Sequence, residues 1–363
     1  MDEADGEAHE RTAMRARRAA RGTPAAGQSA LFDDDVAPGP ARAGEVRAAE
    51  PAPAVRALAA RLRERFGDRL ALGTSSWHFP GWAGLVWDRP TPAAVLSRTG
   101  LAAYARHPLL RTVSLDRAFY RPLPATEYAA LAAQVPEDFR FVVKAPALVT
   151  DASVRDASGR ETGANPHFLD PRTAVEACAA PALEGLGAAL GALVLQLSPL
   201  PAAWRERPEA LLPRLEATLA AVRSALPPTA LVALEVRDAA WLSPATAQRL
   251  RALGVRYALG LHDRLPPIDE QLPMLRATWP GDLVCRWNLQ RGRRYAQARD
   301  AWAPFDRLQA PDPATRETLA RVAAATLAAG HRVVVTINNK AEGCAPRSVI
   351  ALAEAIERTA AAT

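Results

Sequence analysis

Short apolar segments recur along this chain, and each one ends in polar residues. The last of them is residues 333–337 (VVVTI), followed by Asn338, Asn339 and Lys340. A run without polar alternation indicates a strand that is buried on both faces. Similar segments occur at residues 141–144 (FVVK), 193–197 (LVLQL) and 231–237 (LVALEVR). In parallel sheets and barrels, ligands bind at the carboxyl ends of the strands. The pattern therefore predicts that these polar side chains meet at one mouth.

Segments with helical periodicity separate the apolar runs. We expect strands at residues 70–73, 112–116, 139–144, 193–197, 231–237, 256–261, 283–287 and 332–337. We expect helices at residues 56–66, 92–106, 124–134, 173–186, 208–226, 244–253 and 313–329, and from 346 onward, with long loops at 151–170 and 288–311. About eight alternating strands and helices predict an α/β fold, a TIM-type (β/α)₈-like barrel. A doubly wound open sheet is the alternative, but no dinucleotide fingerprint follows the first strand and no phosphate-binding loop motif occurs.

Residues 1–55 differ in composition from the rest of the chain. They are rich in Ala, Gly, Pro, Arg and acidic residues and poor in large apolar ones, which predicts a disordered tail. The barrel domain is then expected over residues 56–363. The tail holds seven Arg and ten acidic residues, a net charge of −3, while the other 38 basic and 29 acidic residues give the body +9.

The charge and the cysteines limit the partners and the compartment. A basic body could attract nucleic acid or phosphate, but its arginines are dispersed, which favours solvated helix faces. No apolar run approaches the ~20 residues of a membrane span, and no apolar segment of a signal peptide opens the chain. Cys178, Cys285 and Cys344 lie far apart, which is typical of a protein of the reducing cytoplasm.

Lysine is almost absent from this sequence. Of 45 basic residues, only Lys144 and Lys340 are lysines, and both follow or close a predicted strand. A lysine among so many arginines suggests that a compact ammonium is needed, and burial readily shifts the pKa of that group. Lys144 is a candidate anchor for an anion, a Schiff-base amine or a base. Alternatively, it forms a salt bridge with Glu235 or Asp116.

The other candidates surround the same predicted mouth. Glu235 and Arg237 lie two residues apart on one face of a strand. Glu235 could be a catalytic acid or base that Arg237 orients, or the two residues could form a structural ion pair. The amides Gln196 and Asn338 suit sugar hydroxyls, or they satisfy loop backbone. Aromatic faces there suit a sugar ring or a nucleobase, or they pack in the core. These aromatic residues are Trp77, Trp82, Tyr120, Trp241, Trp287 and Tyr295.

A divalent metal is a less favoured alternative. Asp116, Glu235, His262 and Asp263 could hold such an ion at neighbouring strand ends. The six histidines, however, are scattered and no two have metal-ligand spacing on one element. We therefore expect no metal site and identify no cofactor. A serine nucleophile is also unsupported, because no nucleophile elbow is present.

Six motifs occur in an order that resembles the DUF72 family of YecE-like proteins. They are GTSSW (73–77), FYRP (119–122), FVVKAP (141–146), LQLSP (195–199), EVRDAAW (235–241) and Asn338-Asn339. The resemblance covers roughly residues 68–356 and implies a TIM barrel, but it supplies no activity. Ser114, Asp116, Asp151 and Asn288 stand where relatives often carry Glu, Asn, His and His. A family reaction that used those residues would be altered in this chain.

These observations predict a cytoplasmic enzyme that acts on a polar, anionic or sugar-like small molecule. Glu235 and Lys144 are the expected catalytic residues, with Glu235 as general acid or base. The expected ligand-binding residues are Arg237, Gln196, Asn338, Asn339, Tyr120, Trp77, Trp241, Arg286 and Asp116. Two alternatives remain open: a nucleic-acid- or phosphate-binding module, and a barrel that binds a ligand without chemistry.

Overall fold

The strands close into a parallel barrel. The computed structural model describes residues 45–156 and 159–362. Around the barrel the strands follow the order β1-β10-β9-β8-β7-β6-β3-β2, and all paired neighbours are parallel. The strands are β1 (Leu70–Thr74), β2 (Thr112–Leu115), β3 (Arg140–Lys144), β6 (Leu190–Gln196), β7 (Leu231–Glu235), β8 (Arg256–Leu261), β9 (Leu283–Trp287) and β10 (Val333–Ile337). The predicted (β/α)₈-like barrel is confirmed.

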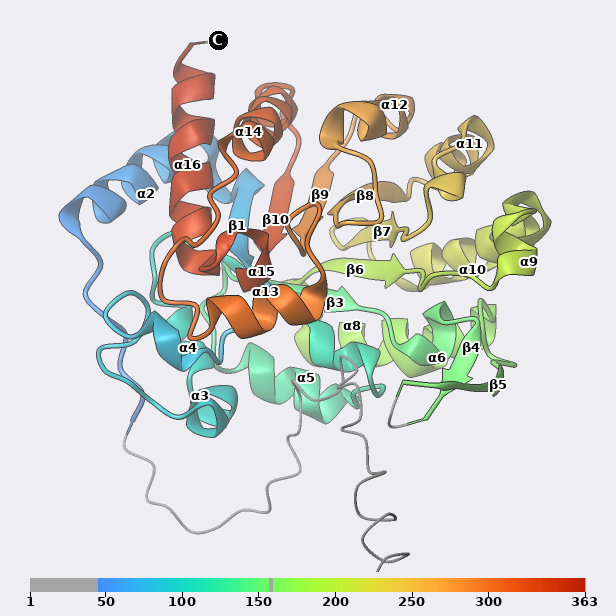
Figure 1. Ribbon diagram of the computed structural model, residues 1–363, viewed down its shortest axis with the longest axis horizontal. Helices are drawn as coiled ribbons and strands as arrows, with labels where there is room; N and C mark the ends of the chain where they lie inside the picture. Colours follow the sequence, from blue (N-terminus) through green and yellow to red (C-terminus); the bar gives the residue numbers. More distant parts are fainter. Residues whose placement is uncertain (1–44, 157–158, 363) are drawn as a thin grey trace, which may run out of the picture. The chain divides into compact units, whose positions relative to one another are not determined.

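Helices surround the barrel (Figure 1). The longer ones are α2 (Pro53–Phe66), α3 (Ala93–Thr99), α5 (Ala125–Ala132), α8 (Ala180–Leu186), α10 (Leu212–Ala225), α11 (Pro244–Ala252), α12 (Ile268–Ala277), α13 (Tyr295–Trp302), α14 (Pro313–Ala328) and α16 (Ala345–Ala361). Short helices are α4 (Leu101–Tyr104), α6 (Ala147–Thr150), α7 (Pro171–Ala174), α9 (Ala202–Arg205) and α15 (Asn339–Glu342). No helix in the described ranges has the length and apolar character that crossing a membrane requires.

The structure differs from the sequence prediction in three segments. Helix α12 was not predicted, because Pro273 inside it interrupts the helical signal. Helix α13 lies within the predicted loop 288–311, whose Gly and Arg residues conceal it. The predicted loop 151–170 contains a two-stranded sheet, β4 (Ser153–Arg155) with β5 (Glu161–Ala164). This hairpin belongs to a different compact unit from the barrel, which takes residues 39–152 and 164–363.

The described part of the chain begins before the predicted boundary at residue 55. Residues 1–44, most of the predicted tail, lie outside the described residues. Ala48 forms an antiparallel bridge with Trp87, and Ala49 N donates to Val86 O at 2.9 Å. Helix α2 then starts at Pro53, which fits the first turn because proline lacks the N–H that a helix start leaves unused.

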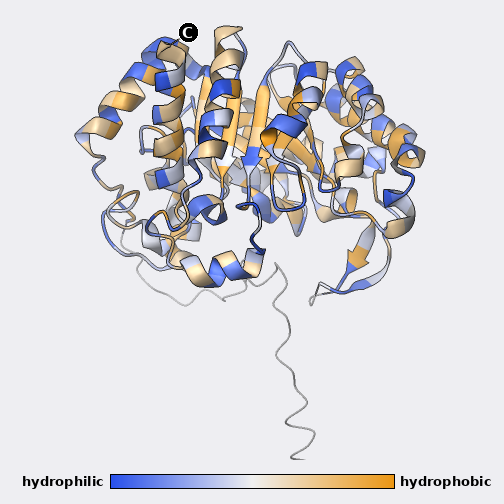
Figure 2. Ribbon diagram, turned by 45° about the horizontal axis from the view of Figure 1, so that its top comes forward, coloured by the Kyte–Doolittle hydropathy of each residue, from blue (hydrophilic) through white to orange (hydrophobic). Residues whose placement is uncertain are grey.

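Small and branched apolar side chains fill the barrel interior. They form one cluster of Ala71, Val142, Ala192, Val194, Leu231, Ala233, Ala258, Val284 and Val334. The opposite faces of the strands contribute to a larger core shared with the helices. Figure 2 accordingly shows the barrel strands mostly in the hydrophobic colour. This double burial explains why the strand segments carry no polar alternation before their ends.

Gly73 allows β1 and β2 to approach each other closely. A Cβ at this position would lie 1.7 Å from Thr112 O, which is a direct overlap with backbone. We expect Gly73→Ala to lower the free energy of unfolding by about 3 kcal/mol, because the strands must separate. Urea denaturation measures this. Gly163→Ala is the control, since its Cβ would meet nothing within 4 Å; equal losses in both variants would contradict the explanation.

Candidate functional site

A polar layer lies above the apolar interior of the barrel. Side chains on one face of a strand alternate with a period of two. Lys144 follows Val142 of the interior cluster at this spacing, as Gln196 follows Val194, Glu235 follows Ala233 and Arg286 follows Val284. These residues therefore occupy the next level toward the carboxyl ends of the strands. Gln196 and Glu235 are also register partners between β6 and β7.

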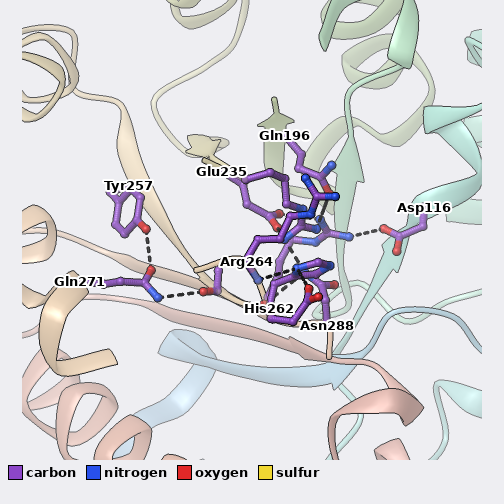
Figure 3. A network of polar contacts seen from close by, with 12 residues as sticks. Asp116, Gln196, Glu235, Tyr257, His262, Arg264, Gln271 and Asn288 are labelled. Carbon is purple, nitrogen blue, oxygen red and sulfur yellow. Dashed lines mark hydrogen bonds and ion pairs between the residues drawn. The ribbon is translucent and has the colours of Figure 1, made fainter. Parts of the chain in front are cut away.

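Arg286 joins the two carboxylates of this layer. Its Nη1 lies 2.6 Å from Glu235 Oε2, and its Nη2 lies 2.5 Å from Asp116 Oδ1. The residue is 1% exposed. Burial alone would lower the pKa of Arg286, but the two carboxylates raise it above its ordinary value. Figure 3 shows Asp116, Gln196, Glu235 and Asn288 converging on this centre from separate segments.

Glu235 is an enclosed anion with two guanidinium partners. It is 0% exposed, and Arg237 Nη1 lies 2.8 Å from its Oε1 in addition to the contact with Arg286. Burial would raise the pKa of Glu235, but Arg237 and Arg286 lower it below its usual range. Gly260 of β8 lies beside this carboxylate, where a Cβ would touch Glu235 Cγ at an ordinary contact distance of 3.6 Å. Of the two roles weighed for the Glu235–Arg237 pair, the observed contact is a buried ion pair.

Arg237 is also bound to Gln196. Its Nη2 donates to Gln196 Oε1 at 2.7 Å. Burial lowers the pKa of Arg237, and Glu235 opposes that shift. The residue is 9% exposed, so it retains more surface than Arg286. Arg237 is therefore the guanidinium of the pair that a ligand in the mouth reaches first.

Lys144 has no acidic partner within ion-pair distance among the described residues, so the salt bridge with Glu235 or Asp116 that was weighed as the alternative is not formed. Its Nζ instead lies 3.5 Å from the centre of the Phe119 ring. Burial lowers the pKa of Lys144 to about 7. Asp116 and Glu235 oppose this shift, while Arg286 and Arg237 add to it. The amine is therefore close to half protonated at neutral pH.

Lys340 and the two asparagines lie where β10 passes into α15. Asn338 Oδ1 accepts from Lys340 N at 3.0 Å, and Asn339 Oδ1 accepts from Ala345 N at 2.8 Å. Both amides thus satisfy backbone, which was the alternative weighed for Asn338. Lys340 Nζ lies 4.1 Å from the centre of the Tyr295 ring, which α13 places beside α15 (Figure 1). Burial also lowers the pKa of Lys340 to about 7.

Most of the predicted aromatic ligand contacts are core residues. Trp77 is 3% exposed and its Nε1 donates to Leu96 O at 3.0 Å, while Trp241 is 1% exposed. Tyr120 is 43% exposed, and Tyr295 is partly exposed. Of the predicted site aromatics, Tyr120 thus offers the largest surface to a ligand.

The acidic residues considered for a metal already have other partners. Arg286 separates Asp116 from Glu235, and His262 pairs with Asp263. Burial lowers the pKa of His262 to about 4. In residues 45–156 and 159–362, no group of three or more His, Cys, Asp and Glu side chains is arranged to hold a metal ion. The carboxylates here are neutralised by guanidinium groups.

The family described as "Protein of unknown function DUF72" matches residues 71–363. The chain belongs to the DUF72 family. A DUF72 protein of Enterococcus faecalis has a similar structure, with 18% identity over 79% of this chain and 95% of that one and a TM-score of 0.52. A DUF72 protein of Thermotoga maritima has 19% identity over 79% and 99%, with a TM-score of 0.49. No curated protein matches this chain. At 18% identity, the likeness to the Enterococcus faecalis protein shows a shared fold and no more.

Two departures from the DUF72 pattern contact the carboxylates of the site. Ser114 Oγ donates to Asp116 Oδ1 at 2.7 Å, and Asn288 Nδ2 donates to Glu235 Oε1 at 3.2 Å. Neither residue was predicted as part of the site, and neither was Phe119. The signal in the sequence that could have identified these three residues was their position near strand ends. In this DUF72 protein, neutral donors therefore support the two anions.

Proposed function

We propose that this DUF72 protein is an enzyme that acts on a small, polar, anionic molecule at the carboxyl-terminal mouth of the barrel. The observation that carries the proposal is the half-buried Lys144 amine, which lies against Phe119 and shares its surroundings with Arg237 and Arg286. Perturbed titratable groups of this kind gather at catalytic sites. TIM-barrel enzymes also place their active sites at this end of the strands.

Lys144 is assigned the role of base or nucleophile. An ordinary lysine with a pKa of 10.5 is unprotonated in only about one molecule in three thousand at pH 7. With a pKa of about 7, about half of the Lys144 amines have a free lone pair. This assignment needs no additional group for activation.

We assign Arg237 the role of binding the anionic group of the substrate. A planar guanidinium matches carboxylate and phosphate oxygens, and Arg237 retains surface that Arg286 lacks. Gln196, which holds Arg237, orients it, and Tyr120 offers a partly exposed ring at the rim. Asp116 and Arg286 stabilise this arrangement indirectly, because Arg286 contacts both Asp116 and Glu235, and Glu235 contacts Arg237.

Glu235 is assigned a positioning role. Two guanidiniums hold it ionised and it is 0% exposed, which disfavours repeated protonation during turnover. Its charge keeps Arg237 and Arg286 in place. The prediction that Glu235 itself acts as general acid or base stays a prediction, with less support than Lys144 has.

A thermal-shift series tests the binding part of this proposal. The wild type, Arg237→Met and the surface variant Arg358→Met would be heated with pyruvate, glyoxylate, sugar phosphates and a DNA duplex. A ligand present at 100 times its Kd stabilises the folded state by about 2.7 kcal/mol. We expect one class of small anion to raise the Tm of the wild type and of Arg358→Met but not that of Arg237→Met.

Three outcomes would contradict the proposal. A shift that persists in Arg237→Met would place the ligand elsewhere. A shift seen only with DNA, and falling steeply with salt, would favour the nucleic-acid-binding alternative. A bound small anion that no assay converts would favour a barrel that binds without chemistry.

The cytoplasm remains the proposed compartment. Cys178, Cys285 and Cys344 are all free and buried, which suits a reducing environment.

A further inference from the structure

We propose that Lys144 attacks the carbonyl carbon of an aldehyde or ketone that also carries an anionic group, and that it holds this substrate as a protonated imine. The inference rests on the proposed function, because it uses the same mouth and the same guanidinium, Arg237. It adds the class of substrate and a covalent intermediate.

The contacts of Lys144 leave its lone pair available. An ion-paired lysine remains protonated, but no described carboxylate lies within 4.0 Å of this amine. Phe119, from the turn that follows β2, covers one side of Nζ at 3.5 Å. The ring face attracts an ammonium, while desolvation and the neighbouring Arg286 and Arg237 lower the pKa of the amine; desolvation beside cationic groups is one of the established ways to obtain a nucleophilic lysine.

The balance of charge in the site favours the same intermediate. With Lys144 neutral, the guanidiniums of Arg237 and Arg286 balance the carboxylates of Asp116 and Glu235. Protonation of the amine would add one uncompensated buried charge. An iminium also carries one positive charge, but a substrate with one negative group brings the compensating charge with it. The sum of charge over Lys144, these two guanidiniums, these two carboxylates and the substrate is therefore zero in the iminium state, as it is over the five side chains before the reaction.

The chemical steps balance without a further reagent. The Lys144 lone pair forms a C–N bond to the carbonyl carbon, while the carbonyl oxygen takes up a proton and the nitrogen loses one. The resulting carbinolamine loses its hydroxyl group, together with a proton from solvent, as water. Addition of water to the C=N⁺ carbon reverses these steps and releases the carbonyl compound and the Lys144 amine.

The scarcity of lysine makes the test selective. The chain holds three primary amines: Lys144, Lys340 and the N-terminus. The full-length protein would be incubated at pH 7 with glyoxylate, glycolaldehyde phosphate or uncharged glycolaldehyde, then reduced with borohydride, and the adducts would be located by peptide mass spectrometry. We expect the adduct on Lys144, and about tenfold faster trapping with the anionic aldehydes than with glycolaldehyde, because the guanidiniums attract them.

Lys340→Arg is the matched control. It removes the other buried lysine and should leave the adduct unchanged, whereas Lys144→Arg should lose it. Comparison of glyoxylate with glycolaldehyde phosphate tells whether the site takes a carboxylate or a phosphate. The Tm of each variant without ligand shows that it is folded.

Equal labelling of the two lysines, or equal rates with charged and uncharged aldehydes, would overturn the inference. A small anion that stabilises the protein through Arg237 but yields no adduct would overturn the covalent step and leave the proposed function standing. Absence of both the stabilisation and the adduct would overturn both.

Discussion

Arg286→Met is expected to lower the free energy of unfolding by about 3–5 kcal/mol, because it leaves buried charge without its partner. The guanidinium is 1% exposed and bridges Asp116 to Glu235. Methionine has a similar length but no charge, so the loss is mainly electrostatic rather than one of volume. Arg237 still neutralises part of the Glu235 charge, which limits the cost to this range.

The exposed pair Arg358–Glu317 provides the matched control. Its ion pair is 2.9 Å long, but the two side chains are 61% and 48% exposed. Arg358→Met should therefore cost no more than about 1 kcal/mol. Urea denaturation of both variants at pH 7 gives the comparison. Similar losses in the two variants would show that burial does not set the energy of the Arg286 network.

A second variant separates the network from general damage at the site. Adding Glu235→Gln to Arg286→Met removes the anion that the first substitution leaves poorly compensated. The double variant should recover part of the lost stability, since the two residues are in direct contact and their effects are not additive. A double variant less stable than the sum of the single changes would contradict the ion-pair explanation.

Much of the fold and the location of the site could be predicted from the sequence. Unbroken apolar runs such as residues 333–337 predicted buried parallel strands, and the polar residues after them predicted the mouth. Lys144, Glu235 and Gln196 do occupy one level of the barrel interior. The reason is simple: strand burial and the alternation of side chains are local properties that one sequence records.

The partners within the site could not be predicted in the same way. Arg286 bridges two carboxylates that lie 170 and 51 positions away in the chain. Such a choice depends on which strands become neighbours in the barrel and on their register, and neither leaves a local pattern in the sequence. The residue types also suited several partners, so Lys144 was equally compatible with a salt bridge that the structure does not contain.

Aromatic residues illustrate the same limit. Trp77 and Trp241 follow strand ends as ligand-binding residues do, yet both are buried. A large side chain near a strand end satisfies either role, and only the packing around it decides. Lys340 shows a different limit. The rarity of lysine in the sequence made this residue a candidate, and the structure encloses it against Tyr295.

Replacing either Lys144 or Lys340 with methionine is expected to stabilise the protein at pH 7 and to flatten the dependence of its stability on pH. The pKa of Lys144 and of Lys340 is lowered from 10.5 to about 7 in the folded protein. Between these two pH values the unfolded chain binds more protons than the folded one, so the free energy of unfolding rises with pH. Below pH 7 the full destabilisation is present. Each lysine accounts for up to about 5 kcal/mol of this rise.

Urea denaturation of the wild type, Lys144→Met and Lys340→Met at pH 7, 8 and 9 measures the effect. The differences between proteins matter, because the buried tyrosines and cysteines titrate alike in all of them. We expect the advantage of each variant to shrink as the pH rises. Parallel curves for wild type and variant would mean that the amine is not forced toward its neutral form. If Lys144→Met gains stability and also loses the aldehyde adduct, then the amine that destabilises the fold is the one that reacts, which is the trade-off expected of a functional residue.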